Sequence, residues 1–450
     1  MHDRTEMLLT APPFGLLMRL SAPNSIAFLI QSGVSLTEVW FIGKLGTTSL
    51  ATIALVFPLL MLTQMMSGGA LGGGVASSIA RAVGAGDLER AERLVWHSIA
   101  YATAGAVVFL LVFMIGGEYF LGFLGGKGDV LGQASLYCLV LFTGGIFIWL
   151  LGVLGAVFRG MGNMQFPARI MVFGAFIQVP LSGTLILGAF GAPQLGVVGA
   201  AVSAVVASLI TSAIMIYKLS LGGMPVNLKR SACVFSRDLF ADISKVALPA
   251  SLSPLLTVAT IISLTAIVGS FGEQALAGYG IGSRIEFLMV PLIFGLGAAM
   301  TALVGMAIGA SNVVRAEHVG WIGGACAAAM AGVIGVTLAL TADSWIPLFS
   351  TDEAIHASAK SYIQIVGPYF AFQGLGLSLY FAAQGAGFMF WPVLATCVRI
   401  ILAIGGALLL AFTLELGLNG VFHAAGLAMA MYGVIIAGSL KLGAWRSGLQ

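Results

Sequence analysis

The strongest constraint on this chain is a series of apolar segments, each about 20 residues long, that recurs from one end to the other. A segment of that length crosses the roughly 30 Å hydrocarbon core of a bilayer as an α-helix. Charged residues make up only 8% of the 450-residue chain, against about 25% in an average soluble domain. The sequence therefore predicts an all-α, multi-pass protein of the inner (plasma) membrane. It excludes a soluble enzyme, a nucleic-acid-binding protein and a disulfide-stapled secreted domain.

Polar and Gly/Pro-rich breaks divide the chain into twelve predicted spans. They cover 16–42, 49–72, 94–116, 131–155, 166–189, 196–218, 246–270, 276–307, 319–342, 358–382, 392–413 and 418–440. The breaks are short, which is typical of a helical bundle, whereas a β-barrel would show alternating segments of about ten residues. The longest polar stretch, at about 219–245, separates a predicted N-lobe at 1–225 from a predicted C-lobe at 226–450.

Basic residues predict the orientation of the spans. With the N-terminus in the cytoplasm, fifteen of the 20 lysines and arginines fall on the cytoplasmic side. Four fall outside and one lies within a span; these are Lys44, Lys127, Arg284, Lys360 and Arg399. We therefore expect both termini and the connector at 219–245 to be cytoplasmic.

The four cysteines and five histidines show no spacing typical of a metal site or a disulfide framework. The predicted spans contain no cluster of His, Asp and Glu residues. We therefore expect no metal, no cofactor and no enzymatic activity.

The two halves of the chain repeat each other at an offset of 225–226 residues. At an offset of 226, Pro23 corresponds to Pro249. At an offset of 225, the run Arg-Ala-Glu occurs at 90–92 and again at 315–317. Further matches at this second offset pair Tyr137 with Tyr362, Gly160 with Gly385, Gly162 with Gly387 and Pro167 with Pro392. Each repeat holds six spans, so the sequence predicts two pseudo-symmetric six-helix lobes of the same orientation.

Parallel repeats of this kind are typical of secondary transporters, which work by alternating access. A channel is the competing class, but no selectivity-filter motif or short pore segment occurs. A passive pore would also leave an intramembrane carboxylate without a role.

The residues that carry the repeat also resemble the MATE (multidrug and toxic compound extrusion) family over essentially the whole chain. The similar stretches include "RLSAPNSIAFLIQSGVSLTEVWFIGKLGTTSLA", "GAGDLERAE", "AVFRGMGNMQFP", "LPASLSPLL", "GYGIGSRIEFLMVPLIFGLGAAMTALVGMAIGA" and "AAQGAGFMFWP". The resemblance implies a cation-coupled antiporter that exports amphipathic, often cationic organic compounds. The first span is most similar to that of the DinF-like branch.

The chain departs from the family pattern at several acidic positions. The family usually has Asp where this chain has Glu38. Spans 246–270 and 358–382 lack the carboxylates of the sodium-coupled branch, and "IQVPLSG" in the fifth span has no Asp. The resemblance therefore favours protons over sodium as the coupling ion.

Glu38 is the predicted ion-coupling residue, because it is the only carboxylate within a predicted span of the first lobe. Gln31 lies seven residues earlier and thus on the same helix face. The alternative interpretation is a carboxylate near the interface that pairs with Lys44.

The candidate substrate-cavity residues lie on several spans. Arg284 and Glu286 are charged residues of the eighth span, and Glu286 either forms a buried pair with Arg284 or Arg399 or acts on substrate or protons. The other candidates are amide, thioether and aromatic side chains suited to organic cations: Gln31, Gln178, Met289, Tyr369, Phe372 and Gln373. For each of these, helix packing or a hydrogen bond between helices is the alternative.

We therefore expect a monomeric secondary antiporter that exports small organic cations in exchange for H+. Na+ coupling is one alternative. Another is a flippase of lipid-linked oligosaccharides, although such a protein needs a basic cavity, and the spans here offer only Arg284 and Arg399.

Overall fold

The computed structural model describes residues 2–446, apart from the side chains of residues 2–4, 287 and 288. The described residues form helices joined by short loops and contain no β-strand. Eleven helical segments are long and apolar enough to cross a bilayer. The bent pair α6 (Gly128–Thr143) and α7 (Gly145–Gly160), whose axes meet at 54°, counts as a twelfth when it is taken as one broken span. The prediction of an all-helical, multi-pass membrane protein is confirmed, with eleven or twelve candidate spans.

Each predicted span corresponds to one helical segment. In the first half these are α2 (Pro13–Gly43), α3 and α4 (Thr47–Gln64 and Gly72–Gly84, joined by a π-helical stretch at Met65–Leu71), α5 (Leu88–Phe123), α6–α7, α8 (Gln165–Leu187) and α9 (Val197–Ser220). In the second half they are α10 (Arg237–Gly269), α11 (Glu273–Gly309), α12 (Val313–Leu340), α14 and α15 (Glu353–Val366 and Phe370–Ala386), α16 (Phe390–Leu408) and α17 (Gly417–Lys441). The short helices α1 (His2–Thr10) and α13 (Ala342–Trp345) lie outside the spans.

Several helices run beyond the ends of the predicted spans. Helix α5 starts where the Asp87 side chain accepts a hydrogen bond from the Arg90 amide at 2.9 Å, and it extends far enough to include Glu92 and Glu118. Helix α10 begins at Arg237, so the non-helical part of the polar connector is shorter than 219–245. The reason is that hydropathy marks the membrane boundary, whereas capping residues mark the end of a helix.

Glu38 stays the only carboxylate within a predicted span of the first lobe, because the acidic residues of helix α5 lie near its ends, outside the predicted span at 94–116. Of these, Glu118 is exposed, and Glu92 is paired with Lys229.

Packing divides the chain into two units whose boundaries fall inside helices. Unit 1 contains Ile26–Leu248 with the first few residues, and unit 2 contains Glu6–Ser25 and the chain from Pro249 onward. The first turns of α10 thus belong to unit 1, and the first half of α2 belongs to unit 2. The second copy of the sequence repeat begins near residue 226, whereas the packed units divide the chain at Leu248–Pro249. The boundary of the repeat and the boundary of the packed units are therefore different.

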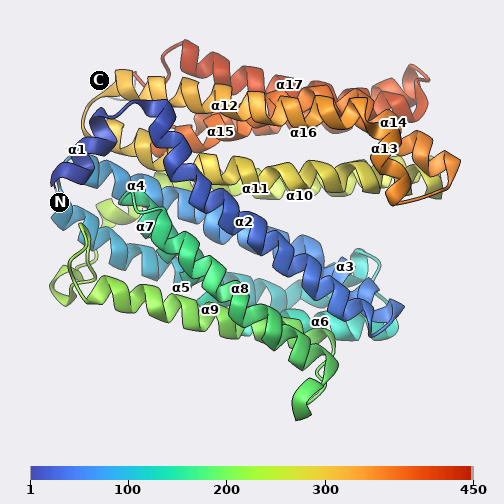
Figure 1. Cartoon of the computed structure of the whole chain (residues 1–450), viewed down its shortest axis with the longest axis horizontal. Coiled ribbons are helices and arrows are strands. Elements are labelled where there is room, and N and C mark those ends of the chain that lie inside the picture. Colours follow the sequence, from blue (N-terminus) through green and yellow to red (C-terminus); the bar gives the residue numbers. More distant parts are fainter. Residues whose placement is uncertain (1, 447–450) are drawn as a thin grey trace. The chain divides into compact units, whose positions relative to one another are not determined.

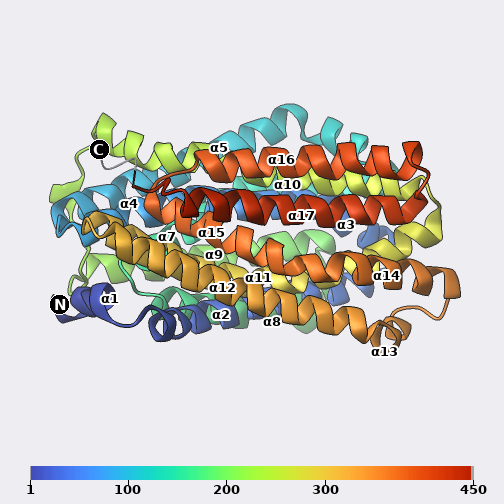
Figure 2. The same cartoon turned by 90° about the horizontal axis from the view of Figure 1, so that it is seen from above.

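The helix contacts inside the two units correspond to each other under the repeat. In unit 1, α7 packs against α4, α5 and α9; in unit 2, α15 packs against α11, α12 and α17. The last two spans of each repeat also pair, as α8 with α9 and α16 with α17. The unit 2 helices α12, α15, α16 and α17 are the orange to red ribbons of Figure 1, and Figure 2 shows α16 beside α17. The pattern of helix contacts inside unit 1 therefore recurs inside unit 2.

A pair of repeat-related glycines allows a close approach of two helix backbones inside each unit. A Cβ on Gly160 would lie 2.8 Å from the backbone oxygen of Ala76, and one on Gly385 would lie 2.4 Å from that of Thr301. Ala76 and Thr301 are themselves 225 residues apart. The glycines match in the repeat because both units need this backbone-to-backbone contact.

Segments near both ends of the described chain pack at the start of α12 in unit 2. The Arg315 guanidinium donates hydrogen bonds to the backbone oxygens of Leu8 and Ala11, at 2.9 and 2.8 Å. Two residues further on, Glu317 accepts hydrogen bonds from Arg446. Leu8, Ala11 and Arg446 therefore lie at the same end of unit 2.

We expect that end to be cytoplasmic, because it collects most of the basic residues. A reporter enzyme that is active only outside the cytoplasm should be active when fused at Gly126 or Thr351 and inactive when fused at Gly222. Activity of the Gly222 fusion, or inactivity of either of the others, would reverse the assigned orientation.

Candidate functional site

The candidate coupling site of unit 1 joins the first and fifth spans. The Gln178 amide nitrogen on α8 donates a hydrogen bond of 2.9 Å to the Glu38 carboxylate on α2. Both side chains are partly buried. The structure therefore brings together two residues that the sequence singled out separately.

Two further polar residues lie beside the Glu38 carboxylate. Ser182, one turn after Gln178 on α8, has a fully buried hydroxyl next to Glu38, without a hydrogen bond of normal length to any described residue. Tyr137 on α6 is 3% exposed and close enough to Glu38 for the two groups to interact electrostatically. The unit 1 site thus consists of a carboxylate, an amide, a hydroxyl and a phenol.

The alternative pairing of Glu38 with Lys44 is wrong. The Lys44 ammonium lies over the ring of Trp40, 3.7 Å from its centre, which is a cation–π contact. Glu38 forms no ion pair with any described residue. The carboxylate therefore lies among neutral groups.

Unit 2 contains a second carboxylate that is bonded to a phenol. The Tyr362 hydroxyl on α14 donates a hydrogen bond of 2.7 Å to Glu286 on α11. Tyr362 is 2% exposed, and the rings of Tyr279 and Phe422 pack against its ring at 5.4 and 5.2 Å between centres. Tyr362 is the repeat counterpart of Tyr137, so each unit places a carboxylate beside the same tyrosine of its repeat.

The arginines predicted as partners of Glu286 do not form an ion pair with it. Arg284 is exposed, and the Arg399 guanidinium lies 5.4 Å from the ring centre of Tyr432. No described lysine or arginine nitrogen lies within 4.0 Å of the Glu286 carboxylate. Arg399 still contributes an attractive charge at longer range. The tyrosine, and no arginine, is therefore the direct partner of Glu286.

The remaining candidates are spread over unit 2 and α2. Met289 is 1% exposed and belongs to the apolar core of unit 2. Tyr369 and Phe372 lie with ring centres 6.5 Å apart, and Gln373 is buried with an amide oxygen that accepts no hydrogen bond from the described residues. Gln31 shares α2 with Glu38 but is not bonded to it.

Ser182, Tyr137 and Tyr362 lie beside the two carboxylates but were not predicted as site residues from the sequence. Ser182 follows Gln178 by four residues, which places both on one face of a helix. The two tyrosines are matched by the repeat. These patterns could have indicated all three residues, whereas the contact of each with its carboxylate depends on packing. The described residues include no group of three or more His, Cys, Asp or Glu side chains that could hold a metal ion.

A multi-pass helical bundle with an internal repeat and intramembrane carboxylates in both halves is typical of membrane transporters. The sequence profile of the MatE family matches residues 23–184 and 249–409. The chain therefore belongs to the MatE family of multi-pass membrane transporters, and the predicted family is confirmed.

Known relatives span nearly the whole chain. The FAD transporter of Shewanella oneidensis is 26% identical over 387 residues, which cover 85% of this chain and 84% of the relative. The probable multidrug resistance protein NorM of Thermotoga maritima is 24% identical, with 85% and 82% covered. Among solved structures, a MOP superfamily transporter from Pyrococcus furiosus superposes with a TM-score of 0.91 at 25% identity, and 98% of each chain is covered.

The direct bond between Tyr362 and Glu286 leads to a specific expectation for substitutions of Glu286. Glu286→Gln keeps a hydrogen-bond acceptor for the tyrosine, so its unfolding temperature should stay close to that of the wild type. Glu286→Leu leaves a buried hydroxyl without an acceptor, which should cost about 1–3 kcal/mol of unfolding free energy. Thermal unfolding in detergent measures both variants.

The double variant Glu286→Leu/Tyr362→Phe is the control, because removing both partners of a hydrogen bond is far less costly than removing one. It should recover most of the stability that Glu286→Leu loses. If Glu286 also lines a substrate pathway, Glu286→Gln should change the range of exported cations while stability is kept. Destabilisation by Glu286→Gln that equals that by Glu286→Leu would show that the negative charge, and not the tyrosine bond, is what the fold requires.

Proposed function

We propose that this protein is a proton-coupled antiporter that exports amphipathic or cationic organic compounds by alternating access of its two lobes, with Glu38 as the coupling residue. The observation that carries the proposal is the neutral surrounding of Glu38. The Gln178 amide donates a hydrogen bond to it, and no cation pairs with it among the described residues.

A carboxylate without a cationic partner suits a proton cycle. Leaving water is costly for a charged carboxylate, and binding a proton removes that cost. An amide, a serine hydroxyl and a phenol can hydrogen-bond to either form of the side chain, because none of them depends on its charge. The site can therefore accommodate both the protonated and the deprotonated states.

Coupling then requires that the two lobe arrangements differ in their affinity for the proton. Glu38 would be loaded from the acidic outside and would release its proton to the less acidic cytoplasm. Each pH unit across the membrane supplies about 1.4 kcal/mol per proton moved. That free energy drives export only if proton binding and substrate binding favour different states of the transporter.

The substrate class is inferred from the family and from named relatives. The Thermotoga maritima relative is named a probable multidrug resistance protein, and proteins from two Staphylococcus species with 24–25% identity are named multidrug export proteins. The Shewanella oneidensis relative is named an FAD transporter, so a dinucleotide belongs in the same test.

The test is efflux from proteoliposomes that contain the purified protein. A fluorescent organic cation, or FAD, is loaded inside, and proton and sodium gradients are imposed separately. We expect efflux of the cation with the proton gradient and none with sodium alone. Efflux with sodium alone would assign Na+ as the coupling ion. Efflux of FAD without the cation would replace the proposed substrate class.

A further inference from the structure

Arg159 is a buried cation that the proposed coupling site does not use. It lies in the last turn of α7, and only 9% of its surface is exposed. Among the lysines and arginines whose side chains are described, it is the most buried. A guanidinium carries five hydrogen-bond donors and keeps its charge in proteins, so its burial within a membrane bundle points to a function.

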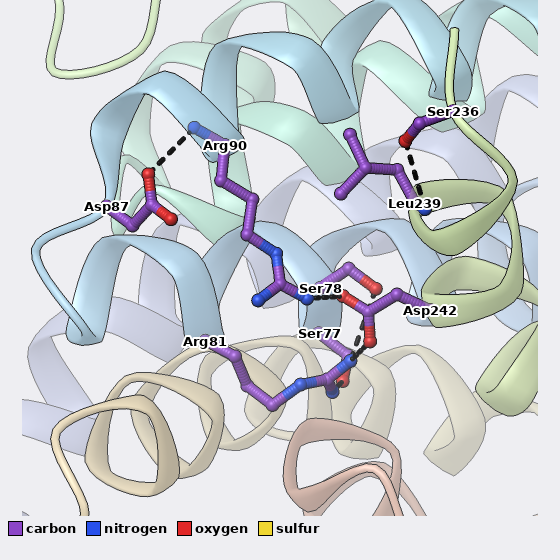
Figure 3. A network of polar contacts seen from close by, with 8 residues as sticks. All are labelled: Ser77, Ser78, Arg81, Asp87, Arg90, Ser236, Leu239 and Asp242. Atoms are coloured by element: carbon purple, nitrogen blue, oxygen red, sulfur yellow. Dashed lines mark hydrogen bonds and ion pairs between the residues drawn. The ribbon is translucent and has the colours of Figure 1, made fainter.

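Arg81, in the last turn of the neighbouring helix α4, shows how a shielded arginine of unit 1 is stabilised. Its guanidinium donates to one oxygen of the Asp242 carboxylate at 2.7 Å, and the other oxygen accepts from Arg90 at 2.8 Å. Figure 3 shows the Arg81 guanidinium between this carboxylate and the hydroxyls of Ser77 and Ser78, to which it is also bonded. The side chain of Arg81 is 18% exposed, so an arginine less buried than Arg159 has a carboxylate and two hydroxyls as partners.

Arg159 has no such partner in the part of the chain that the structure describes. No described carboxylate oxygen lies within 4.0 Å of its nitrogens. No backbone oxygen, side chain or aromatic ring among the described residues forms a hydrogen bond or a cation–π contact with it either. Its small remaining exposure includes the nitrogen atoms, so a ligand can reach them.

The side chain of Arg159 lies back along α7, away from the end of the helix. One guanidinium nitrogen would be 3.1 Å from a Cβ on Gly155, which is one turn earlier, so the glycine leaves room for the charged group. A cation that neutralised the negative end of the helix dipole would instead extend toward the carbonyl oxygens of the last turn. The helix end therefore does not explain this charge.

The repeat places a neutral side chain at the matching position of unit 2. Gln384 corresponds to Arg159 at the offset of 225, directly before the matched glycines Gly160 and Gly385. Gln384 is fully buried, and its amide donates to the Tyr380 hydroxyl at 3.4 Å. Both glycines make their close backbone contacts, so this contact does not require a positive charge at the preceding position.

We propose that Arg159 anchors an oxyanion-binding site in unit 1, which takes the phosphate or carboxylate group of an amphipathic organic compound. The planar guanidinium can donate two parallel hydrogen bonds to either group. The anion supplies the negative charge that the described residues do not, and it relieves the cost of an unpaired buried cation. The inference rests on the proposed export function and extends its substrate class to compounds that carry an oxyanion.

Substitution of Arg159 by the residue of the matching position tests the site. Without an added anion, Arg159→Gln loses an unpaired buried charge, so its unfolding temperature in detergent should equal or exceed that of the wild type. A lower unfolding temperature, or failure of this variant to fold, would overturn the proposal, because it would show that the fold itself requires the charge.

Anion binding is measured by the rise of the unfolding temperature with inorganic pyrophosphate or citrate, at an ionic strength kept constant with sodium chloride. The wild type should respond with a saturable rise. Arg159→Gln should need at least tenfold more of either anion for the same rise, and Arg159→Lys, which keeps the charge but not the planar fork, should lie between them. Arg169→Gln is the matched control, because Arg169 is an exposed arginine on α8, and it should respond as the wild type does. Equal responses of the wild type and Arg159→Gln would refute the site.

A lipid headgroup could supply the same phosphate chemistry, and nanodiscs distinguish the two sources. We expect pyrophosphate to stabilise the wild type equally in phosphatidylcholine nanodiscs and in nanodiscs that also contain phosphatidylglycerol. Loss of the pyrophosphate response in the presence of phosphatidylglycerol would assign the site to a lipid and overturn its assignment to a transported compound.

Efflux from proteoliposomes under a proton gradient tests the substrate class. The wild type should export carboxyfluorescein, a fluorescent carboxylate, and Arg159→Gln should export it at least tenfold more slowly. Both should export a fluorescent organic cation without carboxylate or phosphate groups at equal rates. Export of the cation but not of carboxyfluorescein by the wild type would overturn the extended substrate class. If the wild type exports neither compound, the proposed function fails, whereas the anion response of the unfolding temperature does not depend on transport.

Discussion

Glu38→Gln is expected to abolish proton-driven export, with a loss of at least tenfold that brings the rate to background. The glutamine can still hydrogen-bond to Gln178, so the fold should be kept, but it cannot take up or release a proton. Substrate binding in detergent should therefore remain, while efflux from proteoliposomes under a proton gradient is lost. Glu38→Asp, which has the residue usual in the family, should retain much of the rate.

Glu118→Gln provides a matched control for this experiment. Glu118 is also a carboxylate on a unit 1 helix, but it is exposed. Its substitution should leave export at the wild-type rate. Export by Glu38→Gln at a near wild-type rate would remove Glu38 from the coupling mechanism.

Gly385→Val is expected to destabilise the fold strongly, because its side-chain atoms would overlap the backbone of a neighbouring helix. A Cβ at this position would be 2.4 Å from the Thr301 oxygen and 3.0 Å from the Thr301 Cα, and these backbone atoms cannot move aside as a flexible side chain could. Overpacking of this kind costs about 1–3 kcal/mol, and sometimes more. We expect a sharply lowered unfolding temperature in detergent and poor yield of folded protein.

The repeat supplies a second case and a control. Gly160→Val should behave in the same way in unit 1, because its Cβ would lie 2.8 Å from the Ala76 oxygen. Gly405→Ala, inside α16, meets no atom within 4 Å and should stabilise the helix by up to about 1 kcal/mol. Equal stability of Gly385→Val and Gly405→Ala would show that the close contact is not needed for folding.

The contacts of the two Arg-Ala-Glu runs, at 90–92 and 315–317, explain part of the sequence repeat that hydropathy does not. Arg90 and Arg315 match in the repeat, yet one binds a carboxylate and the other binds two backbone oxygens. In both repeats the arginine thus binds a segment from another part of the chain, but the partner group is a carboxylate in one unit and backbone oxygens in the other.

The number of spans, the family and the repeat could be read from the sequence because they are properties of the linear chain. Apolar length alone determines that a segment crosses the bilayer, and the register of Pro23 with Pro249 or Gly160 with Gly385 requires no knowledge of packing. Helix ends were predicted less well, because caps such as Asp87 extend a helix beyond its apolar part. Intramembrane charges such as Glu38 and Glu286 were found for the same reason as the spans: each is costly in an apolar environment and stands out from its neighbours.

Only the tertiary structure decided which groups meet. The rotation of each helix about its axis brings Gln178 within hydrogen-bond distance of Glu38, and Tyr362 within hydrogen-bond distance of Glu286. The same rotation buries Met289 in an apolar core. It also places Lys44 over Trp40 instead of beside Glu38. The exchange of the first turns of α10 and α2 between the units is likewise a result of packing. Sequence spacing defines the faces of a single helix, but which faces come together depends on the side-chain packing of all the helices in a unit at once.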